Sequence, residues 1–598
     1  MKALRWLVVL LFVLALVAGA YLLIPRKSKT PAGAAVLAPD TFLFLQSPSI
    51  PRAKQEFKTT SVYRIWRETE VQEFLGKGVE ALREGFKEKA GDNSYLDLSR
   101  QGMALAEGEI FLAIPVLEGL KQIPPIVVGM DVKQRRAEAD AWLAKLKVQF
   151  QKDGLEIEEG SGTQDGVAFT RWTAEGRVVC HGYFGTLLVF TTDEQTMKEA
   201  IERWKNPRTP SLAQDSRYQN AVKRLPASYA ALVYSNPQPL LAMLKGVALL
   251  MPQLQTGLKN MEAIRAISYS MTMANGSFQD VFFVDAPADK RGDMGKESLP
   301  TARKTLPLTS DTTLLYTVQS LDLSKVWDTF YQQLQQAPVS DLQKFLFQIE
   351  KFNRANGLNL PKDLLDSLGP EYAFAMQWDD GAQLPDVFFA LEVRDRAKAS
   401  AGLDKLWDLG KNFTTNSYSP EAVRNLMAET KHGKETIHTV KVDGYPVSPS
   451  YVVSDRFFLL SLHAETAKSL LAKHDNAGKT LADNAMYQQA MQSLPKDGHS
   501  YLFLDTARLF ERVYGFAAPL ARQHAGGRAE VRQYLDLNKL PQAKTIAQHL
   551  KPAVATQVVD KDGFTTVIIS PVGTPFLVVG AAQAAVLSYM VYRPNFPL

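Results

Sequence analysis

Hydrophobic positions along this chain follow helical and strand spacing in alternation. Between residues 71 and 87, apolar side chains recur at steps of three and four, which predicts an amphipathic helix. Short apolar runs such as 42–45 and 564–570 predict strands, and several strands are joined by short Gly/Asp/Asn turns. The clearest turn is Asn275-Gly276, which predicts a β-hairpin. Interleaved strands and helices with short strand connections predict an α+β fold with a largely antiparallel sheet.

This pattern occurs twice, in the same order. The best-matched blocks keep one constant offset, pairing Leu212-Ala213, Tyr218-Gln219, Ala221 and Leu225-Pro226 with Leu481-Ala482, Tyr487-Gln488, Ala490 and Leu494-Pro495. Upstream, Glu109-Ile110-Phe111-Leu112-Ala113 matches Glu371-Tyr372-Ala373-Phe374-Ala375. Chance similarity would not preserve the order, so we expect two homologous tandem lobes with largely antiparallel sheets and packed helices, plus an N-terminal transmembrane helix.

The predicted organisation has six parts. They are a membrane anchor (1–24), a linker (25–37), repeat lobe 1 (38–287), an inter-lobe linker (288–307), repeat lobe 2 (308–573) and an apolar C-terminal helix (574–598).

The N-terminal prediction rests on an unbroken apolar run from Trp6 to Ile24, preceded by Lys2 and Arg5. Its length approaches the thickness of a membrane and exceeds the apolar region of most cleaved signal peptides. We therefore expect an uncleaved signal-anchor, with a cleaved signal as the alternative. A large domain after a short anchor favours an extracytoplasmic location for the bulk of the chain.

The C-terminal run from Phe576 to Tyr592 is also apolar. It is at the lower limit of length for a membrane span, and Gln583 lies near its centre. Both a second span and a docked helix are consistent with this segment.

Composition narrows the classes of function. The chain has 598 residues, with 68 basic and 63 acidic side chains, and this near balance gives no nucleic-acid-binding signature. A mean hydropathy of -0.14 excludes a protein with many membrane spans. The single cysteine, Cys180, lies in an apolar run that predicts a buried strand, and its neighbour His181 must point to the opposite face.

Local catalytic and metal-binding motifs are missing from the sequence. Phosphate-binding glycine loops, zinc-binding His pairs and nucleophile elbows do not occur. We therefore predict no catalytic residues, no metal and no cofactor, and leave a hydrolase with a non-local active site as an alternative.

One helical segment is apolar nearly all round, which is typical of a helix bound to lipid, held by a partner or buried in a core. The candidate surface for an apolar ligand or partner is Leu240, Leu241, Met243, Leu244, Val247, Leu250 and Met251. A buried core helix is the alternative.

The two Leu-Ala blocks, the N-terminal apolar run and the strand entry at Pro39-Asp40-Thr41 together resemble a family of uncharacterised bacterial membrane-anchored envelope proteins, classified as a domain of unknown function. The resemblance implies membrane anchorage and a periplasmic location at the inner membrane. We accordingly expect a membrane-anchored binding or scaffolding protein of the envelope, whose partners are the membrane and either an envelope protein or a lipid. The alternative is a carrier of lipid or another apolar ligand.

Overall fold

The structure is a computed structural model of the chain. It describes residues 26–27, 32–90, 94–117, 124–248, 261–292, 295–336, 364–379, 384–415, 425–441, 447–475, 478–525 and 535–574, with isolated residues between these ranges.

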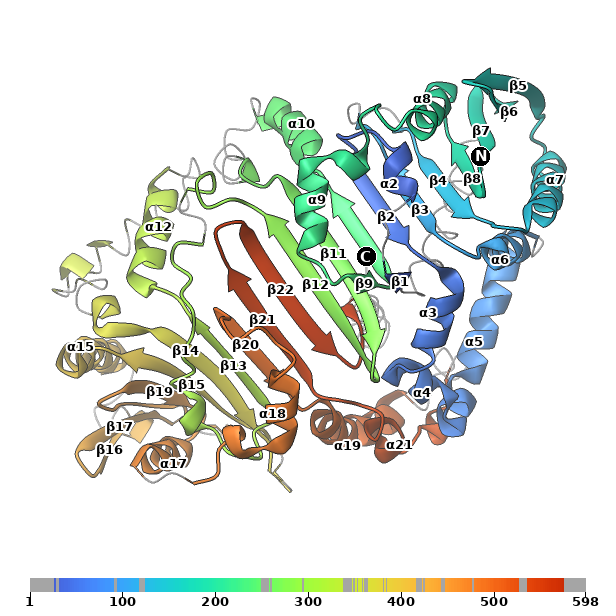
Figure 1. Ribbon diagram of the computed structural model, residues 1–598. Helices are drawn as coiled ribbons and strands as arrows, with labels where there is room; N and C mark the ends of the chain where they lie inside the picture. The colour runs from blue at the N-terminus through green and yellow to red at the C-terminus, as the bar shows by residue number, and fades with distance from the viewer. Residues whose placement is uncertain are drawn as a thin grey trace, which may run out of the picture.

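Within these residues, twenty strands form one continuous sheet, and every neighbouring pair is antiparallel (Figure 1). From one edge to the middle the strands are β5 (Glu158–Gln164), β6 (Val167–Ala174), β7 (Arg177–Phe184), β8 (Leu187–Thr191), β4 (Val127–Asp131), β3 (Ile110–Ile114), β2 (Leu43–Ser47), β10 (Ala231–Ser235), β11 (Ala266–Ala274) and β12 (Ser277–Asp285). From the middle to the other edge they are β22 (Gly563–Ser570), β21 (Ala553–Val559), β20 (Ser500–Leu504), β13 (Leu315–Ser320), β14 (Leu368–Gln377), β15 (Asp386–Val393), β19 (Phe457–Ser461), β18 (Ser450–Val453), β17 (Glu435–Val440) and β16 (Met427–His432). A separate pair joins β1 (Arg26–Lys27) to β9 (Ser228–Tyr229).

The two halves of the sheet follow the same order of strands, read inward from each edge. They meet at a seam where β12 pairs with β22, from Phe278 opposite Ser570 to Asp285 opposite Gly563. Because the last strand of each half pairs with that of the other, neither half has a free edge at the seam.

One face of the sheet, here called the covered face, carries a core that runs through both halves. Its helices are α2 (Ala32–Val36), α8 (Glu194–Lys205), α9 (Ser216–Lys223), α17 (Ala464–Asp475) and α18 (Ala485–Met491), and α9 lies in front of the sheet in Figure 1. The fully buried rings of Tyr234 and Tyr316 belong to this core, as do Val281 and Val567 on the two sides of the seam. The seam is therefore held by side-chain packing as well as by backbone hydrogen bonds.

Helices on the opposite face lie toward the two ends of the sheet. The first half has α3 (Ile50–Phe57), α6 (Ser94–Leu105) and α7 (Arg136–Lys152), which bury residues such as Trp142. The second half has α12 (Leu323–Gln336) and α15 (Arg396–Thr415), which pack on a smaller cluster around Leu368 and Val393. Further helices are α4 (Ser61–Arg67), α5 (Thr69–Ala90), α10 (Gln238–Ala248), α19 (Thr506–Ala525) and α21 (Ala543–Ala547).

Several local predictions are confirmed. Asn275 and Gly276 have φ values of 53° and 82°, as a tight hairpin turn requires, and join β11 to β12. Cys180 is completely buried on the covered face, and His181 packs against Trp172 on the other side of the sheet.

The two Leu-Ala blocks have the same local structure. Each forms a one-turn 3-10 helix followed by a short α-helix, η1 (Leu212–Gln214) with α9 and η5 (Leu481–Asp483) with α18. Asp215 caps α9 and Asn484 caps α18, each side chain accepting from a tyrosine N–H, at 3.1 Å from Tyr218 and 3.0 Å from Tyr487. The pattern in the sequence therefore reflects capping and core requirements that occur in both halves.

A buried carboxylate also occurs at the start of the second strand in each half. Glu109 accepts from the backbone N–H groups of Ala32 and Gly33, at 2.9 and 3.0 Å. Glu371 accepts from the backbone N–H of Thr305 at 2.8 Å. In both halves, the carboxylate fixes the segment that leads into the first strand.

The predicted α+β class with a largely antiparallel sheet is confirmed, but the predicted arrangement differs from the structure in two respects. The two expected lobes share one continuous sheet, because β12 and β22 pair across their boundary. The expected transmembrane helix is also overturned, since in the described part of the chain no helix is both long and apolar enough to cross a membrane. The runs 6–24 and 576–592 lie outside the described residues.

Candidate binding face of the sheet

The face opposite the covered face, here called the open face, combines apolar character with exposure. Side chains alternate between the two faces along each strand, so every second residue of β13 points to the open face. Tyr316 and Val318 of β13 are buried on the covered face, whereas Leu315 and Thr317 are partly exposed on the open face. An antiparallel sheet with a solvated face usually places polar residues there. This face instead mixes polar residues, such as Thr317 and Gln319, with many apolar ones.

The apolar residues of the open face extend across the middle of the sheet and the second half. Those that are exposed or partly exposed are Leu315, Phe374, Met376, Val387, Phe389, Leu460, Leu502, Leu504, Phe564 and Ile568, together with Leu43, Ile267 and Val284 of the first half. Leu460 and Ile267 are 40% and 37% exposed, although both lie within strands.

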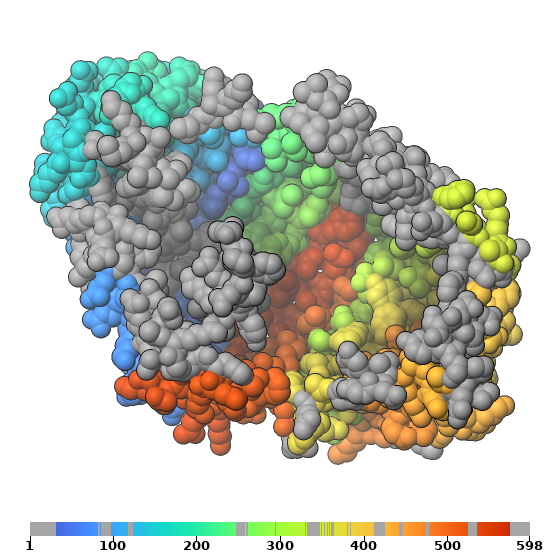
Figure 2. Space-filling view, turned by 180° about the vertical axis from the view of Figure 1, so that it is seen from behind, coloured from blue at the N-terminus to red at the C-terminus, as the bar shows by residue number. Residues whose placement is uncertain are grey.

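The shape of this face suits an elongated ligand. Seen from behind, in Figure 2, the green and red strands in the middle of the sheet lie at the bottom of a hollow. Full burial of one large apolar side chain contributes about 1.5–3 kcal/mol, so a ligand covering several of these residues gains substantial binding free energy. A contiguous apolar surface of this kind is typical of a binding site.

The open face holds a buried carboxylate whose two oxygens are both hydrogen-bonded. Asp280 is fully buried and accepts from the Tyr269 hydroxyl at 2.6 Å. Its other oxygen accepts from the backbone N–H and the hydroxyl of Thr574, each at 2.8 Å. Asp280 therefore fixes Thr574, the last described residue, on the middle of the sheet.

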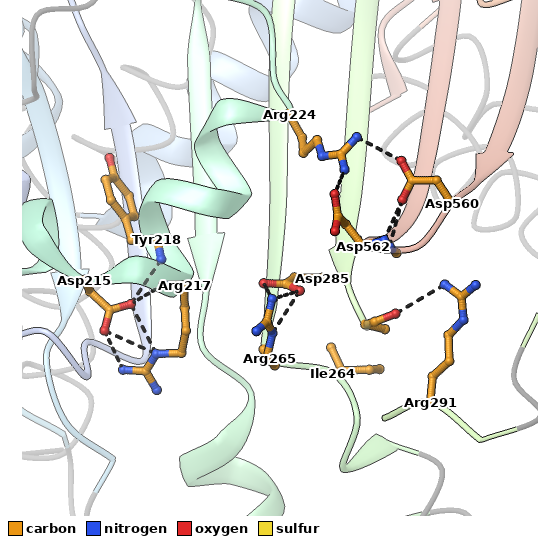
Figure 3. A network of polar contacts seen from close by, with 12 residues as sticks. Asp215, Arg217, Tyr218, Arg224, Ile264, Arg265, Asp285, Arg291, Asp560 and Asp562 are labelled. Carbon is orange, nitrogen blue, oxygen red and sulfur yellow. Dashed lines mark hydrogen bonds and ion pairs between the residues drawn. The ribbon is translucent and has the colours of Figure 1, made fainter. Parts of the chain in front are cut away.

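A network of ion pairs lies beside the seam (Figure 3). Arg224, the residue after α9, pairs with Asp560 at 2.9 Å and with Asp562, both in the β21–β22 turn of the other half. Nearby, Arg265 pairs with the buried Asp285 at 2.7 Å. Arg224 bridges two aspartates of the other half, so this network connects the two halves of the sheet.

The histidines and the cysteine have surroundings that favour neutral, unreactive forms. Burial lowers the pKa of His181 to about 4, and it also lowers the pKa of His438, whose ring stacks on Tyr451 at 4.6 Å. Burial and the nearby Glu194 raise the pKa of the Cys180 thiol to about 11, which keeps it protonated. Within the described ranges, no three His, Cys, Asp or Glu side chains are grouped so that they could hold a metal ion.

The sequence placed the candidate apolar surface on α10, and the structure gives a mixed outcome for its residues. Leu241 is buried and Leu244 packs beside it against Leu258, while Leu240 and Met243 are partly exposed. The remaining candidates are not described in full, because Val247 lies in α10 without a described side chain, and Leu250 and Met251 lie outside the described residues.

The open face itself was not predicted. A signal for it exists, because strands such as Leu502-Phe503-Leu504 are apolar at consecutive positions and so must present apolar residues to both faces. Without the positions of the helices, such a run is indistinguishable from a strand buried on both sides.

Comparison with protein families places this chain in a family whose function is undefined. The model of the family described as "Protein of unknown function (DUF3352)" matches residues 180–525, which is more than half of the chain. The chain belongs to this family.

No curated protein sequence matches the chain. Among solved structures, crystal form III of TP0453 matches with 11% identity and a TM-score of 0.23, covering 44% of this chain and 81% of that one. Crystal form IV of TP0453 gives 12% identity and the same TM-score, with 42% and 79% covered. These scores are too low to carry an argument about fold or function.

Proposed function

We propose that this chain is a non-catalytic binding protein whose open face binds an apolar ligand, with lipid acyl chains as the ligand class. The observation that carries the proposal is the row of partly exposed apolar side chains across β20, β13 and β14. The bonded state of Asp280 and of the ion pairs at the seam supports binding rather than reaction at this face. A protein partner, as in the scaffolding prediction, is the alternative occupant. The envelope location stays a prediction.

We also infer that the two halves are homologous lobes. The common order of strands, the two capped Leu-Ala blocks and the paired carboxylates Glu109 and Glu371 support this inference. On this view both lobes contribute to the open face, the second more than the first.

The test uses Phe374 in β14 and Leu502 in β20, which flank Thr317 on the open face. Titration with the fluorescent fatty acid cis-parinaric acid should show saturable binding to the full chain. Phe374→Asp and Leu502→Asp each place a charge on the apolar face, and each should weaken binding about tenfold or more. Both side chains are partly exposed, so the introduced carboxylate can reach water and the fold should persist.

Leu384→Asp is the matched control. Leu384 is 47% exposed and lies in the loop between β14 and β15, so the same charge is added outside the open face. Its affinity for the probe should be unchanged. Equal probe binding by wild type and both open-face variants would refute the proposal. If a cross-linker placed at position 374 attached to a protein and not to a lipid, the scaffolding alternative would be favoured.

A further inference from the structure

Helix α19 presents an apolar stripe to the outside of the molecule. Val513, Phe516 and Leu520 are 47%, 61% and 40% exposed, and their spacing of three and four residues places them on one side of the helix. The opposite side is bound to the protein, because Ala518 is buried and the Tyr514 hydroxyl donates to the carbonyl of Pro541.

The helix that follows the matching strand of the first half is different. There α10 follows β10 as α19 follows β20, yet Leu241 and Leu244 of α10 pack on Leu258 and Lys245 pairs with Glu262 at 2.9 Å. The exposure on α19 is therefore not a requirement of this position in the fold.

Basic side chains accompany the stripe. Arg508 and Arg512 continue the row of Phe516 and Leu520 toward the start of α19 at four-residue steps. On neighbouring α4, Trp66 is 41% exposed, and its chain neighbours Arg64 and Arg67 are exposed too.

Both helices lie along the same end of the molecule, with α21 beside them (Figure 1). Glu68, which follows α4, contacts His549, two residues beyond α21, at 2.6 Å. Glu70 accepts from the backbone N–H of Gln542 at 2.7 Å, directly before α21. These contacts attach the end of α4 to α21, and α19 contacts the segment before α21 through Tyr514 and Pro541. We call residues 61–67 and 506–525 the rim.

We propose that the rim binds an anionic phospholipid surface. Exposed Trp, Phe, Leu and Val with interspersed Arg form the pattern by which interfacial helices contact a membrane, with apolar residues in the acyl boundary and guanidinium groups at the phosphates. Arginine matches phosphate geometry especially well. The rim is distinct from the open face, so its binding does not depend on the proposed ligand.

The test measures contact between α19 and vesicles with a fluorescent label on this helix. Ala517→Cys places a thiol in the exposed stripe, and the native Cys180 is completely buried, so a nitrobenzoxadiazole label should react only at position 517. Vesicles of phosphatidylglycerol and phosphatidylcholine should shift the emission of this label to the blue, while vesicles of phosphatidylcholine alone should have little effect. Adding Phe516→Ser and Leu520→Ser should lower the apparent vesicle affinity about tenfold or more, because each buried apolar side chain contributes strongly to partition.

Phe347→Cys is the matched control, since Phe347 is 63% exposed and belongs to the segment between α12 and β14, outside the rim. Its label should not respond to vesicles. The open-face variant Phe374→Asp, combined with the label at 517, should respond like wild type, which separates this proposal from the ligand proposal. Any of three results would overturn the assignment. The label at 517 could fail to respond to anionic vesicles, it could respond equally to neutral vesicles, or its response could be unchanged by Phe516→Ser and Leu520→Ser.

Discussion

Replacing Glu109 with Gln should change how the free energy of unfolding depends on pH. Glu109 is buried and its carboxylate accepts from Ala32, Gly33 and the Gln46 amide, at 2.9 to 3.0 Å. Burial dominates these bonds and raises the pKa of Glu109 from 4.5 to about 7. The folded chain therefore retains a proton between these two values that the unfolded chain has lost.

The sign of the effect follows from this proton balance. Below pH 4.5 both states are protonated and the group contributes its full stability. As pH rises from 4.5 to 7 the unfolded state releases its proton while the folded state retains it, so the unfolded state is favoured and stability falls. With a shift from 4.5 to about 7, the loss between pH 5 and pH 8 is about 2–3 kcal/mol.

The assay is urea unfolding followed by tryptophan fluorescence at several values of pH, for wild type and Glu109→Gln. The quantity compared is the difference in the free energy of unfolding between wild type and Glu109→Gln at each pH. His181 has a lowered pKa, so it makes the stability of both proteins rise with pH, and this contribution cancels in the difference. Wild type should lose stability relative to the variant as pH rises. A difference that stays constant from pH 5 to 8, or that changes in the other direction, would refute this account of Glu109.

Two other predictions test the packing. Gly129→Ala should destabilise the protein by about 1–3 kcal/mol in a thermal or urea melt, because a Cβ there would lie 2.0 Å from the buried Phe111 ring. The control is Gly246→Ala in α10. A Cβ at that position meets no atom within 4 Å, so this change should be neutral or stabilising. In the native protein, Cys180 should remain unmodified by a thiol reagent at pH 8, because its thiol is buried and its pKa is raised to about 11. In urea it should react fully. Rapid modification of the native protein would contradict the burial of Cys180.

The elements that could be predicted from the sequence are those fixed by local chemistry. The turn at Asn275-Gly276 and the two capped Leu-Ala blocks depend on backbone conformation and nearby hydrogen bonds, so short stretches of sequence reveal them. The seam between β12 and β22 depends on pairing between strands far apart in the chain, and nothing local in Phe278 or Ser570 indicates their partner.

The open face is hard to predict from the sequence for a related reason. Leu502 and Phe374 have the same apolar character as buried neighbours such as Phe503, and only the distribution of helices over the two faces distinguishes them. The sequence points instead to the segment 240–251 as a candidate surface, because its apolar pattern is continuous. In the structure, Leu241 and Leu244 of this segment pack inside the protein on Leu258.

The antiparallel seam has a consequence for any separated half. Two identical strands that pair antiparallel are related by a two-fold axis, so an edge of this kind is complementary to itself. A fragment ending after Asp285 would leave the hydrogen-bonding groups of β12 without β22 and would expose Val281 and Phe283 at its border. We expect such fragments to associate in pairs through β12, so that a second copy takes the place that β22 holds in the full chain.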